Sequence, residues 1–357
     1  MNINRILEVQ HGDTLRALRQ FLAAWWVQNK LDAMLAPVEL LESSSIPPQV
    51  IENPAGLAAV NPFAPFMTSN AAGIADRFVQ ENSDQRLAIL LRPCELRAFV
   101  ELQKRRPVAP QPNEVVILGV DCIGTFTHSD YLLSLEAHGL SSVTADVLRN
   151  AAEGGLRPQR FRTACMVCDW PGPCGADVTI GAIGVPSNEF LLVIARDEAT
   201  DERLGLNALT GALATEYQVS HRETVVGAVA DMRAGMRRGL IEEMQTAYRF
   251  NDLGSFLAWF ASCSLCGQCL DACPMYHGQF DNLLGKRASQ QSGRAALAEL
   301  VLISRWIASC SGCGMCEEVC ENQVPLTLLI SALSHRVRSE MHYKCGDPAQ
   351  PPPWSRH

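Results

Sequence analysis

The sequence predicts two domains of different fold class: an N-terminal α/β domain with a mostly parallel or mixed sheet, then an all-α domain. In the first two thirds of the chain, short apolar runs alternate with segments of helical periodicity. In the last third, apolar residues repeat every three or four positions around two groups of cysteines. The 357 residues, 47% of them hydrophobic, suffice for two buried cores. We expect the domains at 1–235 and 236–345, with a tail at 346–357.

The α/β domain is predicted most clearly by two continuous apolar runs, LAILL at 87–91 and VVILGV at 115–120. Such runs are typical of parallel strands that are buried on both faces. Between them, Leu96, Phe99 and Val100 have helical spacing, so the three segments predict a right-handed βαβ unit. We expect further strands at 32–37 and 190–195, and helices near 14–29, 70–80 and 231–247.

A cysteine follows each strand of this unit, Cys94 in RPCEL and Cys122 in VDCIGT. Open α/β sheets bind their ligands at the carboxyl ends of parallel strands. Cys94 also begins a helix, where amide donors and the helix dipole favour a thiolate. The matched positions of the two cysteines indicate a shared site, although a single free cysteine is often only a small buried residue.

A C-x2-C pair, Cys165 and Cys168, supplies two more thiols to the same domain. Alone, this spacing is ambiguous between metal binding and dithiol redox chemistry. With Cys94 and Cys122 it makes four thiolates, the number that holds one [4Fe-4S] cluster. Cys174, just after the pair, is the rival ligand, whereas we interpret Cys345, in a polar and proline-rich stretch, as incidental.

The helical domain contains two copies of the spacing C-x2-C-x2-C-x3-C. Three thiolates of such a run bind one [4Fe-4S] cluster, and the fourth binds the other cluster. This crossed pairing predicts one cluster on Cys263, Cys266, Cys269 and Cys320, and a second on Cys310, Cys313, Cys316 and Cys273. Structural zinc needs fewer cysteines than this duplicated pattern provides. Disulfides need an oxidising compartment, and the opening MNINRILEVQ has no signal-peptide pattern, so we expect a cytoplasmic protein with thiolate ligands.

Helices are expected around both cysteine runs. A stripe of apolar residues predicts a helix from about 294 to 308, and helical spacing also precedes the first run at 253–260. After the second run, Pro325 suits a first helical turn, and the stripe continues through Leu326, Leu329, Ile330, Leu333 and Val337.

Charge and hydropathy exclude two classes of partner. The formal net charge is -8 and the chain has no basic tract, which argues against nucleic acid. No apolar run approaches the roughly 18 residues of a membrane span.

Three segments, LRPCELRAFVEL, LGVDCIGT and CMVCDWPGPCGADVTIGAIG, together resemble the β-subunit family of deazaflavin (coenzyme F-420) hydrogenases and formate dehydrogenases. The region 250–340 resembles the α-helical ferredoxin domains of heterodisulfide reductase C subunits and fumarate reductase iron-sulfur subunits. The first resemblance implies FAD beside a [4Fe-4S] cluster, with Asn70 and Arg92 as candidate flavin contacts. Asn70 also suits a helix N-cap, and Arg92 a surface ion pair.

The two resemblances imply an iron-sulfur oxidoreductase subunit of a formate dehydrogenase or hydrogenase-like complex. It would pass electrons between a catalytic partner and a flavin or a soluble hydride carrier, deazaflavin or nicotinamide. The partner would be of molybdopterin, nickel-iron or heterodisulfide reductase type, because the chain has no room for a formate-oxidising domain. Two alternatives stay open: a heterodisulfide or thiol reductase component, and an electron-relay adapter without flavin.

Overall fold

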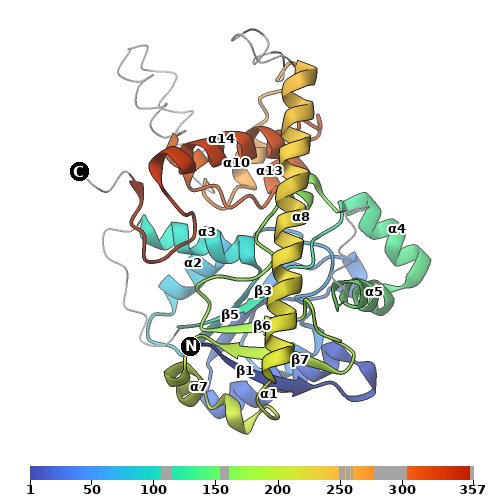
Figure 1. Ribbon diagram of the computed structural model, residues 1–357, viewed down its shortest axis with the longest axis vertical. Coiled ribbons are helices and arrows are strands. Elements are labelled where there is room, and N and C mark those ends of the chain that lie inside the picture. Colours follow the sequence, from blue (N-terminus) through green and yellow to red (C-terminus); the bar gives the residue numbers. More distant parts are fainter. Residues whose placement is uncertain are drawn as a thin grey trace.

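The computed structural model describes residues 1–105, 115–152, 161–248, 254, 258, 260–276 and 304–353. A sheet flanked by helices forms the larger part of the molecule (Figure 1). The segment that carries the cysteine runs lies beyond one end of this sheet, next to α3 (Pro93–Lys104). Among the described residues, none of the helices is long and apolar enough to cross a lipid bilayer.

The sheet is mixed, as predicted, with seven strands in the order β1-β7-β6-β5-β4-β2-β3. Four consecutive strands of this order, β6, β5, β4 and β2, are parallel to one another. Strand β7 pairs antiparallel with both β6 and β1, and β3 pairs antiparallel with β2. The strands are β1 (Ile3–Glu8), β2 (Ala33–Pro37), β3 (Pro48–Ile51), β4 (Leu87–Leu91), β5 (Val115–Val120), β6 (Val178–Gly181) and β7 (Phe190–Ala195).

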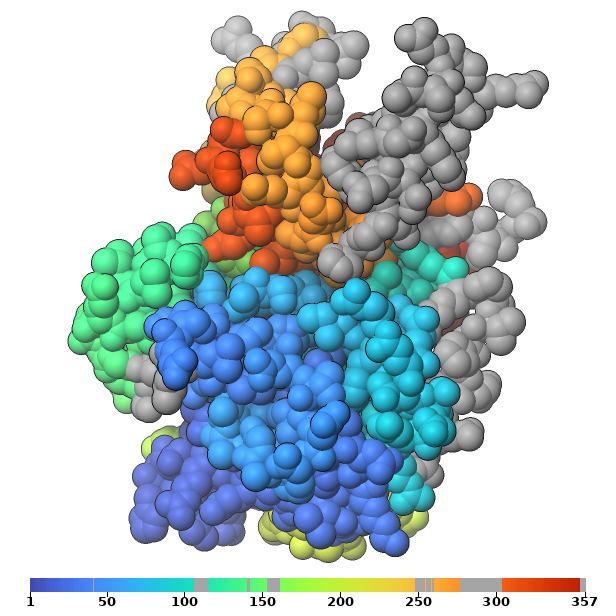
Figure 2. Space-filling view, turned by 180° about the vertical axis from the view of Figure 1, so that it is seen from behind, coloured from blue at the N-terminus to red at the C-terminus, as the bar shows by residue number. Residues whose placement is uncertain are grey.

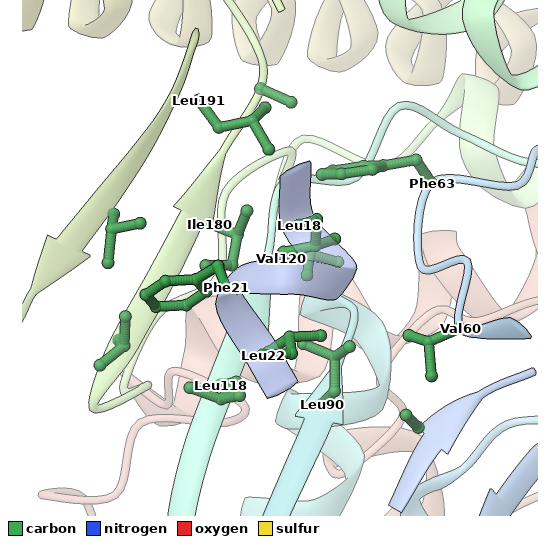
Figure 3. Packing of buried hydrophobic residues seen from close by; sticks show 14 of the residues in the cluster. Leu18, Phe21, Leu22, Val60, Phe63, Leu90, Leu118, Val120, Ile180 and Leu191 are labelled. Atoms are coloured by element: carbon green, nitrogen blue, oxygen red, sulfur yellow. The ribbon is translucent and has the colours of Figure 1, made fainter. Parts of the chain in front are cut away.

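All five residues of strand β4 are apolar and buried, so both of its faces are covered. Ala88 and Leu90 face the core under α1 (Thr14–Asn29), while the other three face α2 (Ala72–Glu81) and α3. Figure 3 shows Leu22 of α1 beside Leu90, within the cluster that also contains Leu118 of β5. Burying a leucine of this kind contributes about 1.5–3 kcal/mol.

The predicted βαβ unit is confirmed as β4-α3-β5, two neighbouring parallel strands with a helix between them. Its strands therefore end at the same edge of the sheet. The other helices of this part are α4 (His128–His138), α5 (Leu140–Ala152), α6 (Thr163–Met166) and α7 (Glu198–Leu204).

Helix α8 (Glu216–Tyr248) connects the sheet with the cysteine-rich segment, as Figure 1 shows. It begins 15 residues before the predicted start at 231, and it spans the expected domain boundary at 235. Arg222 of α8 pairs with the fully buried Asp121 carboxylate at 2.6 Å. Further along, Arg233 donates to the Ile123 carbonyl at 3.2 Å, so α8 is tied to the loop after β5.

The cysteine-rich segment contains α10 (Gln268–Asp271), α13 (Met315–Glu318) and α14 (Leu326–Met341). Helix α14 is the helix predicted after Pro325, and Leu329 and Ile330 are its buried apolar residues. Of the helix predicted at 294–308, residues 304–308 are helical and the rest lies outside the described residues. Most of the helix predicted at 253–260 also lies outside them, so the all-α character stays a prediction.

The segment after α14 packs on α3 through a buried carboxylate, Glu101. Tyr343 donates its hydroxyl to both Glu101 oxygens, at 2.6 and 2.7 Å, and the Gly346 amide donates to Oε1 at 2.7 Å. Lys104 pairs with the same carboxylate at 2.9 Å. The buried carboxylate therefore holds the tail against α3.

Tyr343→Phe should destabilise the protein by about 1–3 kcal/mol, because it removes a hydrogen bond to a buried charged group. Tyr217→Phe is the matched control, since the Tyr217 side chain is 77% exposed and its replacement should have little effect. Denaturant unfolding of both variants measures the difference. Equal stability of the two variants would contradict the role given to Tyr343.

Candidate functional site

The structure places the thiols of the first predicted group near enough to interact electrostatically. Burial raises the pKa of Cys269, and the next causes are the thiols of Cys263, Cys266 and Cys320. These are the three partners that the crossed pairing assigns to Cys269. Cys263 and Cys266 are exposed, so this group lies at the surface of the molecule.

The thiols of the second predicted group also lie near enough to interact electrostatically, and this group is less exposed than the first. Burial raises the pKa of Cys316 well above its usual value, with Cys313, Cys310 and Cys273 as the next causes. These are again the three partners of the crossed pairing. Their role as cluster ligands stays a prediction, but their placement suits a group that needs four converging thiolates.

The four cysteines of the α/β domain surround one small cavity at the carboxyl edge of the sheet. Cys94 is the second residue of α3, Cys122 follows β5, Cys165 lies in α6 and Cys168 lies just beyond it. The described residues contain no three histidine, cysteine or acidic side chains close enough to hold a single metal ion. Four thiols around one cavity match the number and kind of ligand that a cube of iron and sulfide needs.

Cys313 of the second run lines the same cavity. Burial raises the pKa of Cys94 well above its usual value, followed by the effects of Cys122, Glu95 and Cys313. The second and third candidate sites are therefore adjacent. Nothing in the sequence pattern predicts this contact, because Cys94 and Cys313 are more than two hundred positions apart.

The cavity wall favours negative charge at Cys165. Burial opposes ionisation of this thiol. The positive charges of Arg162 and Arg233 and two hydrogen bonds from Thr125 outweigh this effect, so the pKa of Cys165 is lowered. The Thr125 amide and hydroxyl lie 3.3 and 3.2 Å from the Cys165 sulfur. Arg162 in turn donates to the Thr125 hydroxyl at 2.8 Å and to the Cys313 carbonyl at 3.2 Å.

A second buried arginine lies next to Cys168. Arg97 Nη2 approaches the Cys168 sulfur at 3.8 Å and donates to the Ser311 carbonyl at 2.6 Å. Cationic side chains offset the negative charge of four thiolates, and hydrogen bonds to sulfur tune the potential of an iron-sulfur centre. Thr125, Arg97, Arg162 and Arg233 were not predicted, since lone polar residues carry no spacing signal.

Two other cysteines differ in environment. Cys174, the rival ligand, is exposed and does not line the cavity. Cys345 is buried, with its sulfur 3.5 Å from the Ser309 carbonyl and 3.6 Å from that of Cys310. It packs against the second cysteine run, which its proline-rich surroundings in the sequence do not indicate.

The two candidate flavin contacts are both buried. Arg92 donates to the carbonyls of Pro62, Ala64 and Phe66, at 3.2, 2.9 and 3.0 Å, so it fixes a loop and makes no surface ion pair. The Asn70 side-chain oxygen accepts from the Ala72 amide at 3.0 Å, at the start of α2. Its Nδ2 is buried without a hydrogen-bond partner, an atom that a bound ligand could satisfy.

Trp306 donates its indole N–H to the Cys273 sulfur at 3.3 Å. A hydrogen bond to a ligand sulfur stabilises the more negative, reduced state of a cluster. We expect Trp306→Phe to lower the reduction potential of the second centre. One bond of about 1 kcal/mol corresponds to a shift of about 40 mV for one electron.

Anaerobic redox titration, followed by electron paramagnetic resonance, measures this shift. The first centre is the internal control, because Trp306 approaches Cys273 and should leave the potential of the first group unchanged. A shift of both centres by the same amount would show a general loss of structure and contradict the assignment.

Comparison with known proteins supports the function that these groups of cysteines suggest. A 4Fe-4S dicluster domain matches residues 259–324, which include both cysteine runs. The chain thus has an iron-sulfur electron-transfer role. Its 4Fe-4S domain follows the mixed α/β sheet domain in the sequence.

A chain from the xenon-derivatised F420-reducing [NiFe] hydrogenase complex of Methanosarcina barkeri has a similar structure. The likeness covers 69% of this chain and 92% of that chain, with a TM-score of 0.50 and 14% sequence identity. At this identity the likeness concerns the fold.

Proposed function

We propose that this chain is an electron-transfer subunit of a formate dehydrogenase or hydrogenase-like complex, with three [4Fe-4S] centres. The observation that carries the proposal is the cavity at the carboxyl edge of the sheet. Cys94, Cys122, Cys165 and Cys168 line it, and Cys313 of the second group lines it too. The second and third groups of thiols are thus adjacent.

In this function the chain holds the three centres and fixes their positions relative to one another. The first group lies at the surface, where a partner can approach Cys263 and Cys266. The second group is less exposed than the first, and its Cys313 lines the cavity of the third group. In the proposed pairing, Cys273 and Cys320 are exchanged between the two runs. When bound, iron-sulfur clusters exchange single electrons, and buried arginines around the third group stabilise its thiolates.

A catalytic partner of molybdopterin, nickel-iron or heterodisulfide reductase type would exchange electrons with the exposed first group. A soluble hydride carrier, deazaflavin or nicotinamide, would exchange them near the third group. FAD would convert between one- and two-electron transfer there. The resemblance of the α/β domain to the β subunits of deazaflavin hydrogenases and formate dehydrogenases supports this part of the proposal, together with the unpartnered Asn70 amide.

The test is the cofactor content of anaerobically purified protein. We expect about twelve irons and an equal amount of acid-labile sulfide per chain. Flavin absorbance would support the flavoprotein, and its absence at the same iron content would favour the relay adapter. About eight irons with two reactive thiols at Cys165 and Cys168 would favour a thiol reductase component. Protein without iron or labile sulfide would overturn the proposal.

A further inference from the structure

A second cavity, of about 500 Å³, lies between α14 and the segment that follows Cys168. Helix α14, Arg237 of α8, Trp170 and the residues after α14 form its walls. This volume is within the range of small-molecule sites in proteins. A narrower cavity, lined by Cys168, Cys310 and Cys316, shares several of its residues, including Trp170 and Arg338. The larger cavity thus adjoins the second and third groups of cysteines.

The lining of this cavity is strongly cationic in a chain whose formal net charge is -8. Arg97, Arg237, Arg338 and Lys344 line it, together with the histidines His335 and His342. The one carboxylate in the lining, Asp169, pairs with Arg237 at 2.8 Å. Arg97 also faces the Cys168 thiol, but Arg338 and Lys344 have no carboxylate partner in the lining, and their positive charge favours an anionic ligand.

Arg97 provides an observation independent of the charge count. Its side chain lines the cavity and the residue is only 6% exposed, yet its Nη1 has no hydrogen-bond partner. Leaving a buried charged donor unsatisfied is costly, so such an atom indicates a missing acceptor. In the narrower cavity, the buried Thr327 hydroxyl also has no partner.

The remaining lining indicates what kind of anion fits. Ser331, Ser334 and Ser339 add hydroxyl groups from successive turns of α14. Trp170 adds an aromatic ring, with Arg97 and Lys344 each 5.2 Å from its centre. Arginine, lysine and hydroxyl donors suit the several oxygen acceptors of a phosphate, and an aromatic ring suits the planar part of a nucleotide.

We propose that this cavity binds the phosphate-bearing part of a nucleotide-type redox carrier. The inference deepens the proposed function, because it places the carrier's anionic group beside Cys168 and the second run. It assigns Lys344 as the accessible phosphate contact and Arg97 as the buried one. The carrier's site would then be built jointly by the α/β domain and by α14.

The experiment uses the full chain with its clusters in place, titrated anaerobically by calorimetry with pyrophosphate, ADP and adenosine. We expect pyrophosphate and ADP to bind and adenosine to bind at least tenfold more weakly. Lys344→Gln should weaken ADP binding about tenfold, the effect of losing one hydrogen bond to a charged group. Arg336→Gln is the matched control, because Arg336 is an exposed α14 cation that does not line the cavity.

Two results would overturn the inference: no binding of pyrophosphate and ADP to the wild-type protein, or equal binding to the Lys344→Gln and Arg336→Gln variants. In either case the cationic side chains would serve only to balance the charge of the clusters. The iron content of the same samples separates this failure from that of the proposed function, since intact clusters without phosphate binding would leave the electron-transfer proposal standing.

Discussion

Cys94→Ser is expected to remove about four irons per chain and to leave the two centres of the C-terminal domain intact. Serine keeps the size of the side chain but does not provide the thiolate on which iron-sulfur clusters depend. Because Cys94 is the second residue of α3 and follows a fully buried strand, the helix itself should form as before. Iron and sulfide analysis measures the loss, and electron paramagnetic resonance follows the remaining signals.

Cys174→Ser is the matched control for this experiment. Cys174 lies close behind the C-x2-C pair in sequence, but it is exposed and does not line the cavity. Its replacement should leave the iron content at about twelve. If Cys94→Ser retained all of its iron while Cys174→Ser lost four, the third ligand set would have to include Cys174.

The central elements of the α/β domain could be predicted because their residues follow one pattern without interruption. The bounds of β4, β5, β7 and α1 agree with the predicted ranges. Strand β6 was not predicted, since its four residues, VTIG, are too short for a periodic signal. Strand β1 was also missed, because its sequence INRILE mixes charged and apolar residues at the edge of the sheet.

Helix α8 shows why tertiary contacts limit prediction from sequence. Its first half is largely exposed and has polar residues on most sides, so no apolar stripe marks its start. This half is held by the pairing of Arg222 with Asp121, a contact between residues about a hundred positions apart, and by valines that pack on the core of the sheet, Val225, Val226 and Val229. Local periodicity contains no information about such a pair.

The candidate site divides in the same way. Cysteine spacing and strand ends predicted which thiols come together, because thiolate ligands follow local geometry. The polar residues around them, Thr125 and Arg162 for example, come from segments whose approach depends on the whole fold. The burial of Cys345 is of this kind, since it follows from the anchoring of Tyr343 and Gly346 on α3.

The contact between the second cysteine run and the third site depends on a glycine. Gly314 has a φ of +71°, a conformation that favours glycine, and it lies against Ala164 of α6. A β-carbon at position 314 would overlap the Ala164 side chain, and the alanine cannot move aside as a long side chain could. Gly312, two residues earlier, has nearly the same φ, +69°, but a β-carbon there would meet no atom within 4 Å.

Gly314→Ala should therefore destabilise the protein more than Gly312→Ala. Both variants place alanine in the left-handed region, which costs each of them about 1–2 kcal/mol of stability, so this effect cancels in the comparison. The overlap with Ala164 should add about 1–3 kcal/mol to the first variant alone. The loss of cluster absorbance with increasing denaturant concentration measures the difference in stability. In the Gly314→Ala variant, the rate at which the third centre is reduced through the second should also fall. Equal effects of the two substitutions would show that the approach of Gly314 to Ala164 does not hold the two sites together.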